Sequence, residues 1–303
     1  MEKTYEWSKR RDCRRKYSLS TLTASVVGWA AAVVFFFPIF WMVHTSFKTE
    51  EDAQSLDPVF FFSPSLDRYR EVSADFGGNL SAVEAFTNSL SVVLVSTFLV
   101  LLMGIPAAYA LTIRPVEKWR DVLFFFISTK FLPIAAAIVP LFFFADAIPY
   151  PTLGLPFLDT DDLLGTRLGL TIVYTAFNLP LGVWMMRSFF EEVPRELIEA
   201  AQIDGASITS QLRSVILPIV SPGIAATALL SFIFAWNEFF LALNLTAADT
   251  ATVPIWVTGT VDGRGQFFAK LSAAATMASI PVIAAGWIAQ KRLVRGLALG
   301  AIK

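Results

Sequence analysis

The stretch "EAAQIDGASITSQLRSVILP", from Glu199 to Pro218, is an alanine-rich, polar segment between two of the most hydrophobic runs of the chain. Of the 303 residues, 55% are apolar and 16% are charged, whereas soluble proteins average about 45–50% apolar and about 25% charged residues. This composition predicts a membrane protein. We therefore expect the polar segment to lie outside the bilayer, where its side chains can meet water or another protein.

Six apolar stretches are long enough to cross a membrane. A hydrocarbon core about 30 Å thick requires about 20 apolar residues in a helix, because backbone polar groups cannot stay unpaired in lipid. The apolar run of the first stretch is too long for a signal peptide, so we expect a retained anchor. The sequence thus predicts an all-α membrane protein with six transmembrane helices. The expected spans are Leu22–Val43, Leu90–Leu111, Val122–Phe144, Leu168–Met186, Gly223–Leu243 and Leu271–Ala289.

The distribution of basic residues predicts the orientation of these helices. Of the 24 lysines and arginines, 17 lie in the two tails and in the second and fourth connections, and 6 lie in the other three connections. Cytoplasmic connections carry the excess of positive charge in membrane proteins. Both termini and the segment Glu199–Pro218 should therefore be cytoplasmic. The chain divides into a basic N-terminal tail (1–21), a six-helix domain (22–289) and a C-terminal tail (290–303).

The residue inventory argues against several classes of function. A single cysteine, Cys13, and a single histidine, His44, provide no metal cluster and no nucleophile–base pair. The chain has no G-x-x-x-x-G-K-[ST] loop for phosphates, and no connection is long enough for a nucleotide-hydrolysing domain. A formal net charge of −1 indicates no nucleic-acid partner. We expect no catalytic residue, no metal site and no bound cofactor on this chain.

Local rules predict the shape of the polar segment. Pro194 suits the start of a helix, and Glu199 places negative charge toward its positive N-terminal end. Gly205 tolerates a positive φ and should interrupt the helix. Ser207 can cap a second short helix, which Pro218 should end before the next span. The segment should form a short, bent pair of helices at the cytoplasmic surface.

The first of these helices should present two different faces. Arg195, Glu199 and Gln202 are spaced at i, i+4 and i+7 and share a polar face, whereas Leu197, Ala200 and Ala201 form a low-profile surface on another side of the helix. Small side chains permit a partner to approach closely, and an exposed glutamate offers a charge to a partner arginine. This arrangement indicates a contact with another protein.

The spacing within the segment resembles the cytoplasmic signature of binding-protein-dependent ABC importer permeases. The pattern is E-A-A, three residues, G, nine residues, a β-branched residue, one residue and L-P, with Val215 at the β-branched position. Further matches are "NSL" at Asn88, "FAWNEF" at Phe234–Phe239 and the closing "QKRLVRGLALGAIK". The chain is similar to the MalG-type subunit of carbohydrate importers over nearly its whole length. The external stretch 148–165 looks longer than the corresponding connection of that family.

The resemblance implies a type I ABC importer permease fold in the inner membrane. A second permease chain, a homodimeric cytoplasmic ATPase that binds ATP and Mg, and a periplasmic or extracellular solute-binding protein would complete the importer. Its cargo would be a sugar, a sugar derivative or a polyol. The external loop 246–270 would engage the binding protein, and the C-terminal tail 290–303 would reach toward the ATPase.

In that family the cytoplasmic segment docks in a cleft of the ATPase and transmits its closure to the spans. The resemblance gives this role to the coupling segment 190–218. Glu199 would pair with a basic residue of the ATPase, and Gly205 would set the bend. The implied coupling residues are Glu199, Ala200, Ala201, Asp204, Gly205, Leu217 and Pro218.

Polar residues within the spans are candidates for the substrate path. Charged groups in a membrane are costly, so they should face a bundle interior, a cavity or a companion chain. Asparagine and tryptophan also suit the hydroxyls and apolar face of a sugar, although both types more often hold helices together. Lys130 could meet an anionic substrate group or pair with an acid of a companion permease. The candidates are Asn88, Lys130, Asn178, Trp236, Asn237 and Glu238.

Two other classes of membrane protein remain as alternatives. A secondary transporter would need paired, broken half-helices in repeated halves and its own ion site. It would also leave the pattern from Glu199 to Pro218 unexplained. An intramembrane enzyme would need a nucleophile, a base or a metal constellation that the spans do not offer.

Overall fold

The computed structural model describes residues 19–74, 81–114, 116–147, 163–260 and 267–300. Apart from an isolated bridge between Gly165 and Thr246, the regular structure in these ranges is helical. Five helical segments there are long and apolar enough to cross a membrane. The prediction of an all-α membrane protein is therefore confirmed. The long helices are α1 (Leu19–Thr45), α4 (Ala82–Thr112), α7 (Arg167–Glu191), α10 (Leu217–Trp236) and α13 (Phe268–Gly300).

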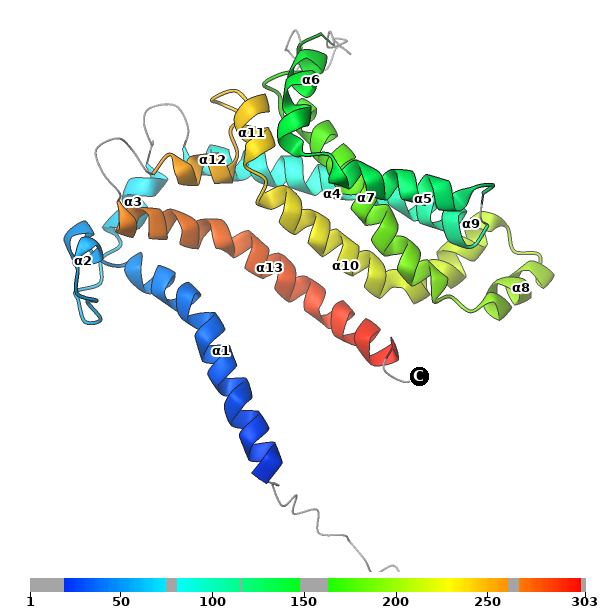
Figure 1. Ribbon diagram of the computed structural model, residues 1–303, viewed down its shortest axis with the longest axis horizontal. Helices are drawn as coiled ribbons and strands as arrows, with labels where there is room; N and C mark the ends of the chain where they lie inside the picture. The colour runs from blue at the N-terminus through cyan, green and yellow to red at the C-terminus, as the bar shows by residue number, and fades with distance from the viewer. Residues whose placement is uncertain (1–18, 75–80, 115, 148–162, 261–266, 301–303) are drawn as a thin grey trace, which may run out of the picture.

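The centre of the bundle is formed by α4, α7 and α10, with α13 packed beside α10 (Figure 1). Glycines let these helices approach closely: a Cβ atom at Gly182 would collide with Val100, and one at Gly223 would collide with the ring of Phe189. Small residues commonly permit such contacts between membrane helices. In contrast, α1 diverges from α13 toward its N-terminal end, and its residues 22–40 are exposed.

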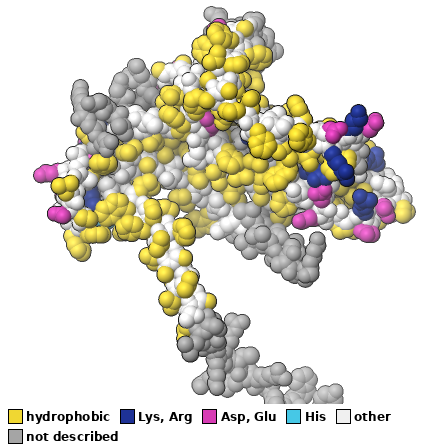
Figure 2. All heavy atoms as spheres, viewed as in Figure 1, with side chains coloured by type: hydrophobic (Ala, Val, Ile, Leu, Met, Phe, Trp, Pro, Cys, Tyr) yellow, Lys and Arg dark blue, Asp and Glu magenta, His cyan; other side chains and the backbone are white. Residues whose placement is uncertain are grey.

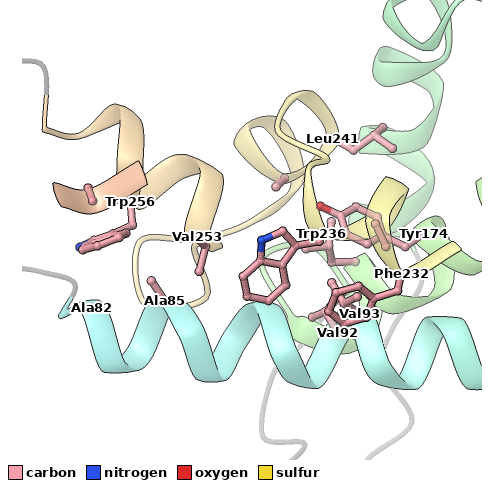
Figure 3. Close-up of a cluster of buried hydrophobic side chains, with 14 of the residues drawn as sticks. Ala82, Ala85, Val92, Val93, Tyr174, Phe232, Trp236, Leu241, Val253 and Trp256 are labelled. Carbon is pink, nitrogen blue, oxygen red and sulfur yellow. The ribbon is translucent and has the colours of Figure 1, made fainter. Parts of the chain in front are cut away.

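Two buried clusters hold the central helices together. The larger joins α4, α7 and α10 with the external helix α12 (Val253–Thr258), and Figure 3 shows Trp236 pointing into it. The indole of Trp236 stacks on Phe232 with ring centroids 5.8 Å apart. The smaller cluster lies toward the cytoplasmic end, where Met186 and Phe190 of α7 meet Ile198. The second cluster fixes the polar segment to the bundle.

The third expected span is not one continuous helix. The stretch consists of α5 (Trp119–Ser128), a 3-10 turn η1 (Thr129–Phe131) and α6 (Ile134–Ala147), with a bend of 96°. Pro133 has no N–H to donate, and it forces the preceding residue into extended backbone. Leu132 has φ −68° and ψ 122° accordingly. The described residues contain five candidate spans, or six if the bent pair counts as one.

The fifth expected span also ends early. It was predicted to reach Leu243, but α10 stops at Trp236 and a separate helix, α11 (Phe240–Leu245), follows. The carboxylate of Glu238 accepts hydrogen bonds from the backbone N–H groups of Leu241 at 3.0 Å and Ala242 at 3.2 Å. Glu238 thereby satisfies the first N–H groups of α11, which explains why a new helix begins there.

The end of the bundle opposite to α8 (Arg195–Ile203), which the charge distribution predicts to be external, carries two short helices in the first long connection, α2 (Glu50–Gln54) and α3 (Asp67–Ser73) (Figure 1). The carboxylate of Glu50 accepts hydrogen bonds from the backbone N–H groups of Ala269 and Lys270, at 3.1 and 2.8 Å, and so ties this connection to α13. Lys48 is buried with its ammonium 4.4 Å from the centre of the Trp41 ring, and burial lowers its pKa. Cys13 and residues 148–162 of the external stretch lie outside the described residues.

Candidate functional site

The first helix of the coupling segment is α8 (Arg195–Ile203), which begins directly after Pro194 as expected. Ile198 and Ala201 are buried against the bundle, and the rest of the helix is exposed. Figure 2 shows acidic and basic side chains gathered at this end of the molecule, whereas hydrophobic side chains cover its middle. This separation agrees with an apolar membrane zone and an aqueous, cytoplasmic end.

Gly205 ends α8 in the conformation that the sequence predicts. Its φ is +75°, and its N–H donates to the carbonyl of Gln202 at 3.0 Å while Ala206 donates to Ala201 at 2.9 Å. These bonds satisfy carbonyl groups at the helix end. No heavy atom lies within 4 Å of the place where a Cβ atom would sit. Glycine is favoured here by the backbone conformation and not by lack of space.

The second half of the segment differs from the prediction. Ser207 does cap a helix, because its hydroxyl accepts a hydrogen bond from the N–H of Ser210 at 3.3 Å. That helix, α9 (Ile208–Ser210), does not end at Pro218, however; it continues through a π-helical turn, η2 (Gln211–Ile216), into α10. Proline is tolerated in the first turn of a helix, since its missing N–H needs no intrahelical partner there. Pro218 therefore lies in the first α-helical turn after η2, within the continuous helical segment Ile208–Trp236.

The expected coupling residues are mostly accessible. Glu199, Ala200, Asp204, Gly205 and Pro218 are exposed, Leu217 is half-buried and Ala201 is buried. Three large aliphatic side chains beside them are also exposed, although no membrane is expected here: Leu197 by 45%, Ile203 by 87% and Ile208 by 48%. Exposed apolar groups with polar neighbours are typical of a surface that binds another protein.

A cavity of about 630 Å³ lies beside α8, and we call it the cytoplasmic cavity. The polar face predicted from helical spacing, namely Arg195, Glu199 and Gln202, lies along it. The end of α4, the start of α5 and the end of α7 form its other walls. The lining residues are Leu111, Thr112, Ile113, Trp119, Arg187, Phe190, Glu191, Val193, Arg195, Ile198, Glu199 and Gln202.

Sequence reasoning missed two residues of the cytoplasmic cavity. The guanidinium of Arg187 lies 4.4 Å from the centre of the Trp119 ring and 2.6 Å from the carboxylate of Glu191. The Arg187 side chain is only 13% exposed, and its Nε atom has no hydrogen-bond partner. The contact joins α5 to α7, so no local sequence pattern could reveal it.

A second cavity of about 850 Å³ lies among α7, η1, the start of α6 and the α10–α11 junction. We call it the membrane cavity. Four of the six substrate-path candidates line it: Lys130, Asn178, Asn237 and Glu238. Aromatic side chains, including Tyr174 and Phe177, form much of the remaining wall. The structure thus brings together residues from three separate expected spans.

The two charged residues of the membrane cavity differ in their surroundings. Glu238 is supplied with donors by this chain, because it accepts hydrogen bonds from the Tyr174 hydroxyl at 3.2 Å and from the backbone of Leu241 and Ala242. No acidic side chain in the described ranges lies within ion-pair distance of Lys130. Glu238 therefore has hydrogen-bond donors within this chain, whereas Lys130 has no acidic partner among the described residues.

The remaining two candidates lie elsewhere. Asn88 is fully buried and donates to the carbonyls of Asp249 at 2.8 Å and Ala251 at 2.9 Å, so it ties α4 to the external loop 246–270. Trp236 donates from its indole N–H to the carbonyl of Ala278 at 3.1 Å and borders a separate cavity of about 510 Å³. Residues 261–266 of the external loop lie outside the described residues.

Residues 83–298 match the family model described as "Binding-protein-dependent transport system inner membrane component". The chain is 35% identical over 272 residues to the probable ABC transporter permease protein y4oR of Sinorhizobium fredii, covering 90% of this chain and 92% of that protein. It is 32% identical over 297 residues to the trehalose transport system permease protein SugB of Mycobacterium tuberculosis, covering 96% and 98%.

A third relative is the sulfoquinovosyl glycerol transport system permease protein SmoH of Agrobacterium fabrum, 32% identical over 273 residues and covering 88% of each chain. Among solved structures, a chain of a bacterial ABC transporter involved in the import of the acidic polysaccharide alginate superposes with a TM-score of 0.69 at 23% identity. This superposition covers 91% of the present chain and 97% of the other. It shows that the fold is shared.

Proposed function

Because this chain belongs to the family of binding-protein-dependent transport system inner membrane components, we propose that it carries a sugar, a sugar derivative or a polyol across the inner membrane. It is a multi-pass permease of an ABC importer, and a permease of this kind is not catalytic. Support for the cargo class comes from relatives named for trehalose and for sulfoquinovosyl glycerol transport.

We further propose that α8 and Gly205 form the contact through which an ATPase drives this permease. The observation that carries this proposal is the exposed combination of Glu199 with Leu197 and Ile203 at the cytoplasmic end. Apolar side chains can enter a cleft of the ATPase, while Glu199 pairs with an arginine there in a charge-assisted hydrogen bond. Ile198 anchors α8 to the bundle and would pass its displacement to α7.

The other members of the assembly follow from the same proposal. A homodimeric ATPase would hold ATP and Mg, and an external binding protein would deliver the solute. A second permease would pack against the divergent part of α1, whose residues 22–40 are exposed in this chain. The C-terminal tail 290–303 would offer the ATPase a second contact.

The substrate path in this proposal runs along the membrane cavity. Lys130, Asn178, Asn237 and Glu238 lie on its wall, where aromatic rings can also cover the apolar face of a sugar. Asn88 and Trp236 would act indirectly, since their polar groups are engaged by backbone carbonyls. They would hold the external loop and α13 in place around the path.

Reconstitution into liposomes tests the proposal. The chain is incorporated with a companion permease and the ATPase, and uptake of labelled disaccharides and glycosides is measured with the binding protein outside and ATP at the ATPase side. We expect uptake only when all components and ATP are present. Uptake by the chain alone, driven by an ion gradient, would instead identify a secondary transporter.

A further inference from the structure

We propose that the membrane cavity is an anion-attracting site and that the transported solute carries an acidic group, such as a carboxylate or a sulfonate, which Lys130 binds. This inference rests on the proposed function, because it assumes that the cavity belongs to the substrate path. It names a chemical subclass of solute and a residue that selects it.

The charge balance of the cavity carries the inference. Lys130 and Glu238 are the charged residues in its described wall. Glu238 accepts hydrogen bonds from the Tyr174 hydroxyl and from two backbone N–H groups, so its carboxylate oxygens are already engaged by fixed donors of this chain. Lys130 has no acidic partner among the described side chains. Of these two charged groups, Lys130 is therefore the one whose donors remain available to an acidic group of the solute.

The position of Lys130 in the fold supports the same conclusion. It lies in η1, at the 96° break between α5 and α6, and Ile134 at the start of α6 lines the same cavity. The first N–H groups of a helix carry partial positive charge and favour anions. The 14-residue helix α6 thus adds a second source of positive potential at the wall that holds Lys130.

Lipid is not a suitable environment for this side chain. Lys130 is exposed in the isolated chain, and a charged group facing hydrocarbon is costly. An aqueous path that admits an acidic solute provides the compensating charge only when the solute is present. An acid on the companion permease would provide it permanently, and this alternative predicts a neutral cavity in the assembled importer.

A reporter cysteine distinguishes the two arrangements without knowledge of the solute. Cys13 is the only cysteine of the chain, so Cys13→Ser with Asn237→Cys leaves one thiol, on an exposed residue of the cavity wall. In the assembled importer, with the other subunits free of cysteine, the thiol is labelled with a sulfonate-bearing and with a trimethylammonium-bearing methanethiosulfonate. Both rates are divided by those for free cysteine.

We expect the anionic reagent to be favoured about tenfold, since a unit charge several ångströms away at moderate dielectric changes the free energy by over 1 kcal/mol. Lys130→Gln should abolish the preference, and Lys130→Arg should keep it. A ratio near one in the parent, or no change in Lys130→Gln, would overturn the inference. A preference for the cationic reagent in Lys130→Gln would show that an acid, either Glu238 or one on the companion permease, balances the charge of Lys130, and it would overturn the inference as well.

Protection by simple sugars tests the chemical class. D-glucuronate should slow labelling of the reporter cysteine more than D-glucose at the same concentration, and Lys130→Gln should remove the difference. Equal protection by the two sugars in the parent would contradict the assignment of an acidic solute. Labelling requires neither ATP nor transport, so a failed uptake experiment would reject the proposed function and leave these measurements interpretable.

Discussion

The cytoplasmic cavity and the membrane cavity differ in the number and the pairing of the charged residues in their walls. The wall of the cytoplasmic cavity holds two arginines and two glutamates, of which Glu191, Arg195 and Glu199 are exposed. The wall of the membrane cavity holds one acid that the chain itself satisfies and one lysine that it does not. Water can hydrate unpaired charges at the cytoplasmic end. In the bilayer an unpaired charge is energetically costly, so a residue that carries one is a candidate for a functional role.

The difference suggests two tasks for the two regions. In the proposed function the cytoplasmic region would present a surface to the ATPase, and its shape depends on the backbone at Gly205 and on the anchor Ile198. The membrane region would present the solute path, and its shape depends on the helix break at η1 and on the capped start of α11. Substitutions in the cytoplasmic region should reduce the coupling of ATP hydrolysis to uptake. Substitutions in the membrane region should change the stability of the fold around the path or the selectivity for the solute.

The largest effect should come from Glu199→Lys. A charge-assisted contact at an interface is worth about 1.5–3 kcal/mol, and the substitution would also place like charges together if the ATPase presents an arginine. ATP-driven uptake in reconstituted liposomes should fall by about tenfold or more, while the amount of protein in the membrane stays the same. Glu196→Lys is the matched control, because it makes the same charge change on the same exposed helix. Equal losses of uptake in both variants would mean that the added positive charge on α8 acts nonspecifically and that Glu199 makes no particular contact.

Gly205→Val should have the next largest effect. Only the backbone conformation is disfavoured, by about 2 kcal/mol for a β-branched residue at positive φ, since a side chain would meet open space. Uptake should fall several-fold, measured at equal levels of assembled complex. Asparagine tolerates this conformation better than other residues, so Gly205→Asn should retain more uptake than Gly205→Val. The reverse order would show that the left-handed bend is not what matters.

Tyr174→Phe should weaken the membrane region by about 1–2 kcal/mol. The variant removes the hydroxyl that donates to the carboxylate and to the carbonyl of Glu238. Thermal unfolding in detergent should shift to lower temperature. Tyr109→Phe provides the control, because the buried Tyr109 hydroxyl has no hydrogen-bond partner and its loss should be neutral or stabilising. Equal shifts in both variants would mean that Glu238 does not depend on this hydroxyl.

The smallest effect should come from Trp119→Leu. The ring of Trp119 covers the guanidinium of Arg187, and such a contact contributes about 0.5–2 kcal/mol, with the lower values at exposed sites. We expect a reduction of about twofold to threefold in uptake, with binding-protein-stimulated ATP hydrolysis retained, because α5 would follow α7 less closely. Wild-type uptake in Trp119→Leu would show that this contact carries no displacement between the two helices.

Local chemistry explains which features could be predicted from the sequence. Glycine at a helix end and serine before a helix act through their own backbone and side chain, so Gly205 and Ser207 were placed correctly. Apolar length alone identified most of the spans. The expected stop at Pro218 was wrong because the helical segment continues through η2 into α10, and Pro218 lies in the first α-helical turn after η2.

Features that depend on the packing of distant segments could not be predicted from the sequence. The third span is apolar apart from Ser128, Thr129 and Lys130, and its hydropathy does not show the bend that the backbone makes at Pro133. Glu238 ends the fifth span early because it caps α11, a choice that the hydropathy of the stretch does not reveal. The contact between Trp119 and Arg187 requires α5 and α7 to meet, and the separation of Asn88 from the membrane cavity likewise requires the fold.

The central claim is that Glu199 pairs directly with an arginine of the ATPase. The most direct measurement is a charge swap in the reconstituted importer: the arginine is changed to glutamate in the Glu199→Lys background, and ATP-driven uptake is compared with that of each single variant. Direct pairing predicts that uptake in the double variant exceeds uptake in either single variant. Normal uptake in Glu199→Lys alone, or a double variant no more active than the poorer single variant, would contradict the claim.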